Sequence, residues 1–427
     1  MDILGIFIKD LSTPVIGLKE KVSILIVFLL LPHLALGAGD PKVDPQTGQV
    51  RVLFMGDSLM DAGFVTPIMV RDPMLRISPI PVEFLTGIYE SVEDAARGLR
   101  AYFPRVERQV SEGYDVIIIS DAREPFFPIK IQTWIRNGVV DHGLGFLMAG
   151  GPQTFGGYEP WGHPSWGDSI IGEILPVICL TDWQYASKSY FMRPASGMED
   201  HPLIRDIPWN RIPLECRNRV DSKQGSTVVG VADRYPEGSP ILTFSDMGEG
   251  ISEAFVFDWG GNGPQEFHRS EFIPVFLSNI VYWVARVPIP EDMSLMVRLR
   301  SELTKYFSTR EFVLSVIDFA EKFGANMNKA EVALKESDDD RKEVISLYIS
   351  GDMDGSLQSI GRALDKLDEV SELAMEAKDA ALLWVYLIEW LTVSGTAMFT
   401  GAIVWTLMVK RSAYREVGVT RFDNREP

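Results

Sequence analysis

Histidine, cysteine and basic charge are all scarce in this sequence. Its 427 residues include five His and two Cys, and 41 Lys and Arg stand against 59 Asp and Glu, for a net charge of −18. Proteins that bind nucleic acid need a basic surface that neutralises phosphates. The charge balance therefore argues against nucleic acid as a partner, and it also disfavours peripheral binding to anionic lipid. With 46% hydrophobic and 23% charged residues, the composition is that of a folded protein.

The few histidines do not form a recognisable metal site. His163 with Asp168, and His201 with Asp200, lack the ligand spacing that a structural or catalytic metal requires on a defined element. The sequence therefore predicts no metal and no cofactor.

The two cysteines, Cys179 and Cys216, both fall in a part of the chain that we expect outside the cytoplasm. An even number of cysteines in an oxidising compartment permits one disulfide. Two buried free thiols are the alternative, and the sequence does not decide between them.

Long apolar runs occur near both ends of the chain. Near the N-terminus, Lys19 and Lys21 precede the run Val22 to Leu36, which ends in small residues. A basic flank, a short apolar core and small residues describe a secretory signal peptide. We expect it to occupy residues 1–38, with cleavage after Gly37 or Ala38; an uncleaved anchor is the alternative. Both place the following domain outside the cytoplasm.

The second run, residues 380–409, predicts a transmembrane helix. Its last twenty residues, from Trp390 to Val409, contain no charged side chain, and twenty apolar residues span a hydrocarbon core. Lys410, Arg411 and Arg415 follow at once, which by the positive-inside rule places residues 410–427 in the cytoplasm. The sequence therefore predicts a single-pass type I protein of the cell membrane. Ala397 and Gly401 form a small-xxx-small pair that can bring membrane helices together.

Between these runs, residues 51–287 show strands that alternate with helices, after a polar linker at 39–50. The expected strands are Arg51–Met55, Tyr114–Ser120, a strand at Phe146, Val228–Ala232, Ile241–Ser245 and Glu253–Asp258. The expected helices are Val92–Phe103, Ile129–Asn137 and Glu266–Ala285. This alternation predicts an α/β domain with a mainly parallel sheet sandwiched by helices. Residues 156–221 are rich in Gly, Pro and Trp and show little periodicity.

Residues 288–379 predict a helical stalk in front of the membrane. Ser308 and Glu311 form a capping box that predicts a helix start at Thr309. Two further helices are expected, one over Lys329–Ile349 and one from Ser356 onward. The second carries an apolar stripe that consists of Leu357, Ile360, Leu364, Leu367, Val370 and Leu373. We expect this stripe to pack on the preceding helix as a hairpin; the alternative is contact with a partner chain, either another membrane protein or a second copy.

The stretch GLGFLMAGGPQTFGGY, from Gly143 to Tyr158, contains the strand end that matters most for function. A short apolar run breaks into Gly150-Gly151-Pro152, as a strand does at the carboxyl edge of an α/β sheet, where such folds place their chemistry. A hydrolase would present Ser or Cys at this elbow. Here Ala149, Gly150 and Gly151 stand in its place. The glycine-rich amides could cradle an anion instead, or the segment is a structural tight turn.

Four motifs relate residues 51–286 to a known family: VRVLFMGDS, YDVIIISDA, GGPQTFGGY and ILTFSDMGEGISEAFVFDWGG. Together they resemble the glutamine amidotransferase-like family, whose members include membrane-associated proteins of bacteria and archaea. The resemblance implies the class I glutamine amidotransferase fold, which is flavodoxin-like. Class I enzymes carry a Cys at the elbow and a later His-Glu pair. Here the Cys position falls on Ala149, and no His-x-Glu follows. We therefore expect a binding or scaffold protein without catalysis.

Six residues lie at or just beyond the carboxyl ends of predicted strands: Asp57, Ser58, Asp121, Gly150, Gly151 and Asp258. In an open α/β sheet, such residues converge on one crevice. They are the expected lining of any ligand site.

The alternative function is a hydrolase that uses Ser58 as its nucleophile. Gly56-Asp57-Ser58-Leu59 matches the opening block of GDSL-type esterases, and a divergent amidohydrolase is the related case. Such a serine needs a His base that an acid orients. None of the five histidines has the Asp three residues earlier that the esterases show. The base would have to come from the Trp-rich loops.

Overall fold

The structure, a computed structural model, describes residues 40–56, 65–82, 91–157, 164–184, 189–260 and 264–421. The predicted signal segment, together with Asp57 and Ser58, lies outside these ranges. Contacts divide the chain after Pro41, and the features below belong to the unit that begins at Lys42.

Nine strands form one sheet in the order β2-β1-β3-β4-β11-β10-β9-β6-β7. The strands are β1 Val50–Gly56, β2 Leu75–Pro81, β3 Val116–Ser120, β4 Gly145–Ala149, β6 Tyr190–Pro194, β7 Pro213–Leu214, β9 Thr227–Ala232, β10 Pro240–Met247 and β11 Gly250–Phe255. β5 (Val177–Gln184) and β8 (Arg217–Ser222) form a separate two-stranded sheet. These two strands, with β6 and β7, come from the segment in which the sequence showed little periodicity.

The sheet is mixed, and the prediction of a mainly parallel sheet is wrong in its second half. Pairing is parallel from β2 through β1, β3 and β4 to β11. It is antiparallel from β11 through β10, β9 and β6 to β7. The reason lies in the connections. Only Gly248 and Glu249 separate β10 from β11, and so short a connection allows a hairpin, whereas a parallel pair needs a crossover of a dozen or more residues.

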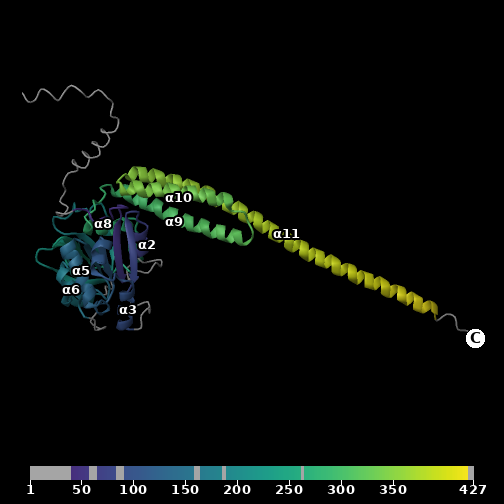
Figure 1. Cartoon of the computed structure of the whole chain (residues 1–427), viewed down its shortest axis with the longest axis horizontal. Coiled ribbons are helices and arrows are strands. Elements are labelled where there is room, and N and C mark those ends of the chain that lie inside the picture. The colour runs from purple at the N-terminus through teal and green to yellow at the C-terminus, as the bar shows by residue number, and fades with distance from the viewer. Residues whose placement is uncertain are drawn as a thin grey trace, which may run out of the picture. The chain divides into compact units, whose positions relative to one another are not determined.

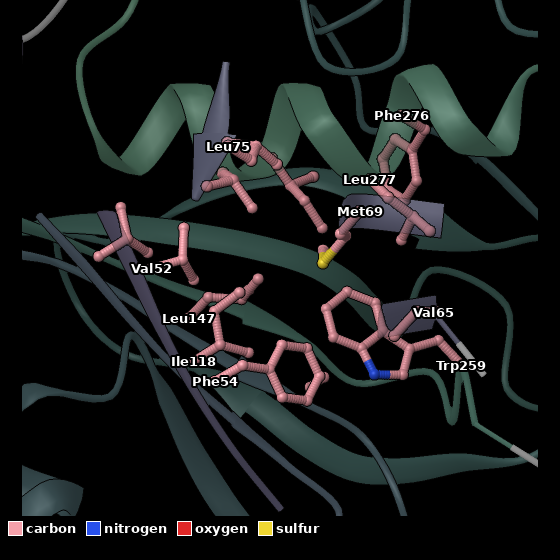
Figure 2. Close-up of a cluster of buried hydrophobic side chains, with 14 of the residues drawn as sticks. Val52, Phe54, Val65, Met69, Leu75, Ile118, Leu147, Trp259, Phe276 and Leu277 are labelled. Atoms are coloured by element: carbon pink, nitrogen blue, oxygen red, sulfur yellow. The ribbon is translucent and has the colours of Figure 1, made fainter. Parts of the chain in front are cut away.

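The parallel half is a layered α/β core. Phe54, Ile118 and Leu147 lie side by side on one face, since they pair in register across β1, β3 and β4. Figure 2 shows these side chains below α8 (Ile273–Val284), with Leu277 of α8 and Met69 of α2 (Val65–Val70) in the same apolar cluster. Phe146 and Met148 alternate to the opposite face and are equally buried. Both faces are therefore covered, which explains why the strands read as continuous Val and Ile runs.

Further short helices in the described ranges are α3 Val92–Tyr102, α4 Glu107–Gly113, η1 Glu124–Phe126, α5 Ile129–His142, η3 Trp166–Asp168, α6 Ile170–Ile174 and η4 Trp209–Arg211. The structure has the predicted helices at α3 and α5, with α5 longer than expected because its αL cap is Gly143. The helix expected over Glu266–Ala285 is two helices, α7 (Gln265–Arg269) and α8, which Ser270 to Phe272 separate.

Three long helices follow: α9 Met293–Lys322, α10 Asn328–Ile349 and α11 Met353–Arg421. The predicted helix start at Thr309 is wrong. α9 begins sixteen residues earlier, where the Asp292 carboxylate accepts a hydrogen bond from the Leu295 amide at 2.9 Å. That cap decides the boundary, so the Ser308–Glu311 pair lies inside a continuous helix.

α9, α10 and the first half of α11 lie side by side as an antiparallel bundle (Figure 1). Ser337 of α10 donates to the Ala363 carbonyl at 2.8 Å, and Ser356 of α11 donates to the Val344 carbonyl at 3.1 Å. Ile360, Leu364, Leu367 and Val370 are buried. The apolar stripe is therefore covered within the chain, as the hairpin prediction required.

A buried polar cluster joins the stalk to the α/β domain. Tyr282 of α8 donates to Asp72 at 2.6 Å and lies 3.2 Å from the hydroxyl of Tyr348 in α10. Arg300 of α9 lies 3.1 Å from the Asp72 carboxylate and donates to Ser278 at 2.7 Å. Burial raises the pKa of both tyrosines, with Asp72 adding to the effect, so the hydroxyls remain protonated donors.

Beyond the bundle, α11 continues alone. Ala381 is the last residue that the bundle buries, and the large apolar side chains after it are exposed, with Trp384 and Trp390 at 65% and 73%. Among the helices in the described ranges, α11 is the one long and apolar enough to cross a membrane.

Candidate functional site

Asp121, Gly150 and Gly151 meet at the carboxyl edge of the sheet. Asp121 follows β3 with a positive φ of 40°, and the two glycines follow β4. Gly151 has φ 155°, and a methyl group on it would overlap the Asp121 carboxylate. The aspartate therefore packs directly onto the glycine turn, and three of the six predicted residues come together.

The turn has no room for a nucleophilic side chain. A methyl group on Gly150 would overlap the backbone of Val256 and Phe257, the continuation of β11. Ala149, where the resemblance places the amidotransferase Cys, ends β4 and is fully buried. In an active elbow the side chain must reach substrate, and none of these three positions exposes one.

The backbone amides of the turn already donate within the protein. Gly150 donates to the Phe255 carbonyl at 2.8 Å and Thr154 to the Gly151 carbonyl at 3.2 Å. Gly151 donates to the Asn218 side chain at 3.0 Å, and Gln153 to Asp121 at 2.8 Å. Pro152 has no N–H. An anion could bind here only by displacing these partners, so the geometry favours the tight turn over the anion cradle.

Asn218 is the residue that sequence reasoning missed. It lies on β8 and is 1% exposed. Both the oxygen and the nitrogen of its side-chain amide form hydrogen bonds with the turn. Its Nδ2 donates to the carbonyls of Gly151 and Thr154, each at 3.0 Å. Its sequence context, Arg217-Asn218-Arg219, shows no signal for this role, because every residue of this short strand except Val220 is polar.

Asp258 lies beyond the end of β11, next to the strand that carries Asn218. Its amide donates to the Cys216 carbonyl at 3.2 Å, and its carboxylate accepts from Gly260 at 3.0 Å. The next residue, Trp259 (Figure 2), donates from its indole to the Ser120 hydroxyl at 2.7 Å, immediately before Asp121. Asp258 thus lies at the same edge as the elbow. Asp57 and Ser58, the remaining predicted residues, lie outside the described ranges.

Arg217, the residue before Asn218 in β8, is a buried cation. The contacts of Asn218 with Gly151 and Thr154 are called the Asn218 clamp below. The Arg217 guanidinium stacks over the Tyr190 ring at 4.6 Å from its centroid and donates to the Tyr235 carbonyl. Burial lowers the pKa of Arg217 and raises that of Tyr190. Arg123 reaches the turn from the other side, donating to the Gln153 side chain at 2.9 Å. Arg123 therefore contacts the turn, whereas Arg217 contacts Tyr190 and Tyr235.

Two of the described histidines, His201 and His268, are partly buried. His201 packs between Phe244 and Trp283, and burial lowers its pKa to about 4. His268 lies 3.2 Å from the Gly260 carbonyl through Nε2, and burial lowers its pKa as well. In the part of the chain that the structure describes, no three His, Cys, Asp or Glu side chains are grouped to hold a metal ion.

The two cysteines are free thiols. Cys179 pairs with Val220 in the β5–β8 ladder, and Cys216 precedes Val220 by four residues. Four residues of strand span roughly 13 Å, whereas a disulfide needs Cα atoms within about 7 Å. The disulfide that the sequence permitted is therefore not formed. Burial raises the pKa of the Cys179 thiol to about 12.

The glycine turn follows β4, the last of the parallel strands before β11 in the sheet order. The model of the family described as "Putative glutamine amidotransferase" matches residues 84–286, and this segment belongs to that family.

Solved structures with a similar chain trace include the cytoplasmic protein STM1381 from Salmonella typhimurium LT2, with 19% identity and a TM-score of 0.45, covering 55% of this chain and 99% of that one. A β-galactosidase from Rahnella sp. R3 has 13% identity and a TM-score of 0.36 over 57% of this chain and 33% of its own. A β-galactosidase from Bacillus circulans sp. alkalophilus has 12% identity and a TM-score of 0.33, and the match covers 56% of this chain and 32% of that one. No curated protein sequence matches the chain significantly.

Proposed function

We propose that this chain is a membrane-anchored binding or scaffold protein whose amidotransferase-like domain does not catalyse glutamine hydrolysis. The observation that carries the proposal is the occupied elbow. Asn218 and Asp121 accept the amide hydrogens of Gly151 and Gln153, and Gly150 and Gly151 leave no room for a nucleophile. Acyl transfer needs both a nucleophile and free donors for the oxyanion.

The anchor in this proposal is the apolar part of α11, residues 380–409, carried by a stalk at 288–379. Its support is the length and apolar surface of α11 together with the Lys410 and Arg411 that follow. The amidotransferase-like domain would lie outside the cytoplasm and residues 410–427 inside it. No cofactor is part of the proposal.

Catalytic silence is tested with the full-length protein in lipid nanodiscs. We expect no release of glutamate from glutamine, and no turnover of a panel of amides and esters, above protein-free nanodiscs. An active class I amidotransferase serves as positive control. Turnover that disappears in the Ser58→Ala variant, or covalent labelling of Ser58 by a fluorophosphonate probe, would overturn the proposal in favour of the hydrolase alternative.

Orientation is tested with single cysteines at two exposed positions, Glu237→Cys in the domain and Tyr414→Cys in the tail. A membrane-impermeant maleimide applied to intact cells should label position 237 at once and position 414 only after permeabilisation. The reverse pattern would place the domain in the cytoplasm and refute this orientation.

A partner contact through Ala397 and Gly401 stays a prediction. Both residues are exposed on α11. Crosslinking through a single cysteine at position 401 (Gly401→Cys) would reveal a second copy or another membrane protein on this face. If no crosslinked product formed in membranes, the predicted contact would be refuted.

A further inference from the structure

Two exposed aromatic side chains lie at the end of α9 farthest from its N-cap. Phe319 and Phe323 are 42% and 41% exposed, and their ring centroids are 4.8 Å apart. They are separated by four residues and so share one face of the helix. Phe312, seven residues before Phe319, lies on the same face. The two rings contact each other and form a small apolar patch on this face of the helix.

The pairing of the helices places this end of α9 next to one level of α11. Ser337 of α10 bonds to Ala363 of α11. Because the two helices are antiparallel, the start of α10 at Asn328, nine residues before Ser337, lies level with Glu372. The turn between α9 and α10 therefore runs alongside the part of α11 that follows Glu372. Ala381, 8% exposed, marks how far the bundle covers α11.

The apolar span begins at residue 380, eight residues after Glu372 and about 12 Å farther along α11. Residues 380–409 form thirty residues of helix, about 45 Å long at 1.5 Å per residue, which matches a bilayer of about 40–45 Å with its headgroup layers. The turn and the two phenylalanines thus lie within about 12 Å of the start of the span, measured along the helix axis. Phe312 lies eleven residues farther up α9 than Phe323, about 16 Å away along the axis.

We infer that Phe319 and Phe323 form a second membrane contact, seated in the headgroup layer at the base of the stalk. Aromatic rings are favoured at this depth because they are apolar yet tolerate the polar interface. Lys322, between them in sequence, is exposed and forms an ion pair with Asp318 at 2.6 Å, so the polar groups beside the rings are also solvated. α11 crosses the bilayer and the turn between α9 and α10 rests on the bilayer surface. The stalk therefore contacts the membrane at two places, which fixes its tilt. The inference rests on the proposed membrane anchor.

The test uses the full-length protein in nanodiscs, with Cys179 and Cys216 replaced by Ala and a nitroxide label at one introduced cysteine. Phe323→Cys reports the contact, and Phe312→Cys is its matched control, with the same residue type, face and helix. We expect the ratio of oxygen to nickel-chelate collision rates to be several-fold higher at position 323 than at position 312. A water-like ratio at both positions would overturn the inference.

A third label at Phe399, in the middle of the proposed span, separates this inference from the anchor itself. A lipid-like ratio at 399 with a water-like ratio at 323 leaves the anchor and refutes the second contact. A water-like ratio at 399 refutes the anchor and, with it, the contact. Spin–spin broadening at 323 that vanishes on dilution with unlabelled protein would show that a second copy, and not lipid, covers the phenylalanines, and would also overturn the inference.

Discussion

Glu253 is the most unusual single residue of the domain. It lies in the middle of β11, paired with Leu147 on one side and Phe244 on the other, on the face that α8 covers. Its side chain is fully buried, and neither carboxylate oxygen has a hydrogen-bond partner among the described residues. Burial raises its pKa well above the ordinary 4.5. The folded protein therefore holds Glu253 in its neutral form.

Replacing Glu253 by Gln should flatten the pH dependence of stability. The unfolded chain releases the Glu253 proton above about pH 4.5, whereas the folded protein retains it until its raised pKa. The contribution of Glu253 to the free energy of unfolding is thus fully present below about pH 4.5, and it falls as the pH rises toward the pKa of the folded protein. Melting temperatures between pH 5 and pH 8 should fall less in Glu253→Gln than in the parent. An equal slope in both proteins would show that Glu253 does not titrate in this way.

A glycine at a strand end is visible in sequence, whereas its hydrogen-bond partners are not. Gly150 and Gly151 were predicted at the carboxyl edge, and Asp121 joins them there because β3 and β4 are parallel neighbours. Asn218 reaches the same turn from β8, which follows it by more than sixty residues. Nothing local to β8 marks that long-range contact, so the clamp could be found only from the fold.

At the scale of elements, the loop around Gly151 depends on the Asn218 clamp. Asn218→Ala leaves the buried Gly151 amide without its acceptor and removes one of the donors to the Gly151 and Thr154 carbonyls. We expect a loss of about 1–3 kcal/mol in the free energy of unfolding. Asn210→Ala, at an exposed asparagine, is the matched control and should change little. Denaturant unfolding of the full-length protein in detergent measures both. Equal stabilities of the two variants would contradict the clamp.

Strand and helix positions followed well from periodicity, whereas strand direction did not. β1, β3, β9 and β10 lie where the apolar runs predicted them, because a buried strand needs such runs in either kind of sheet. Direction depends on the connections, and the two-residue link between β10 and β11 carried that information. Helix starts depend on a single cap, so Asp292 outweighed the Ser308–Glu311 pair that the local pattern suggested.

At the scale of the whole molecule, the buried cluster around Asp72 fixes the stalk to the domain. Asp72 comes from the α2–β2 turn, Tyr282 from α8, Arg300 from α9 and Tyr348 from α10. The sequence spaces these residues over more than two hundred positions, so no pattern in it predicted the cluster. Because Asp72 and Arg300 are both buried, each charge depends on the other for compensation.

Asp72→Asn should therefore weaken the junction strongly. It leaves the Arg300 guanidinium buried without its counter-charge, a change that costs about 3–5 kcal/mol in comparable buried pairs. We expect a lower unfolding temperature in detergent and faster protease cleavage between Val287 and Asp292, where the domain meets α9. Arg300→Met added to Asp72→Asn removes the stranded charge and should restore much of the stability. Asp339→Asn, which breaks an exposed pair with Lys342, is the control and should leave both measurements unchanged. If Asp72→Asn resembled that control, the cluster would not be what holds stalk and domain together.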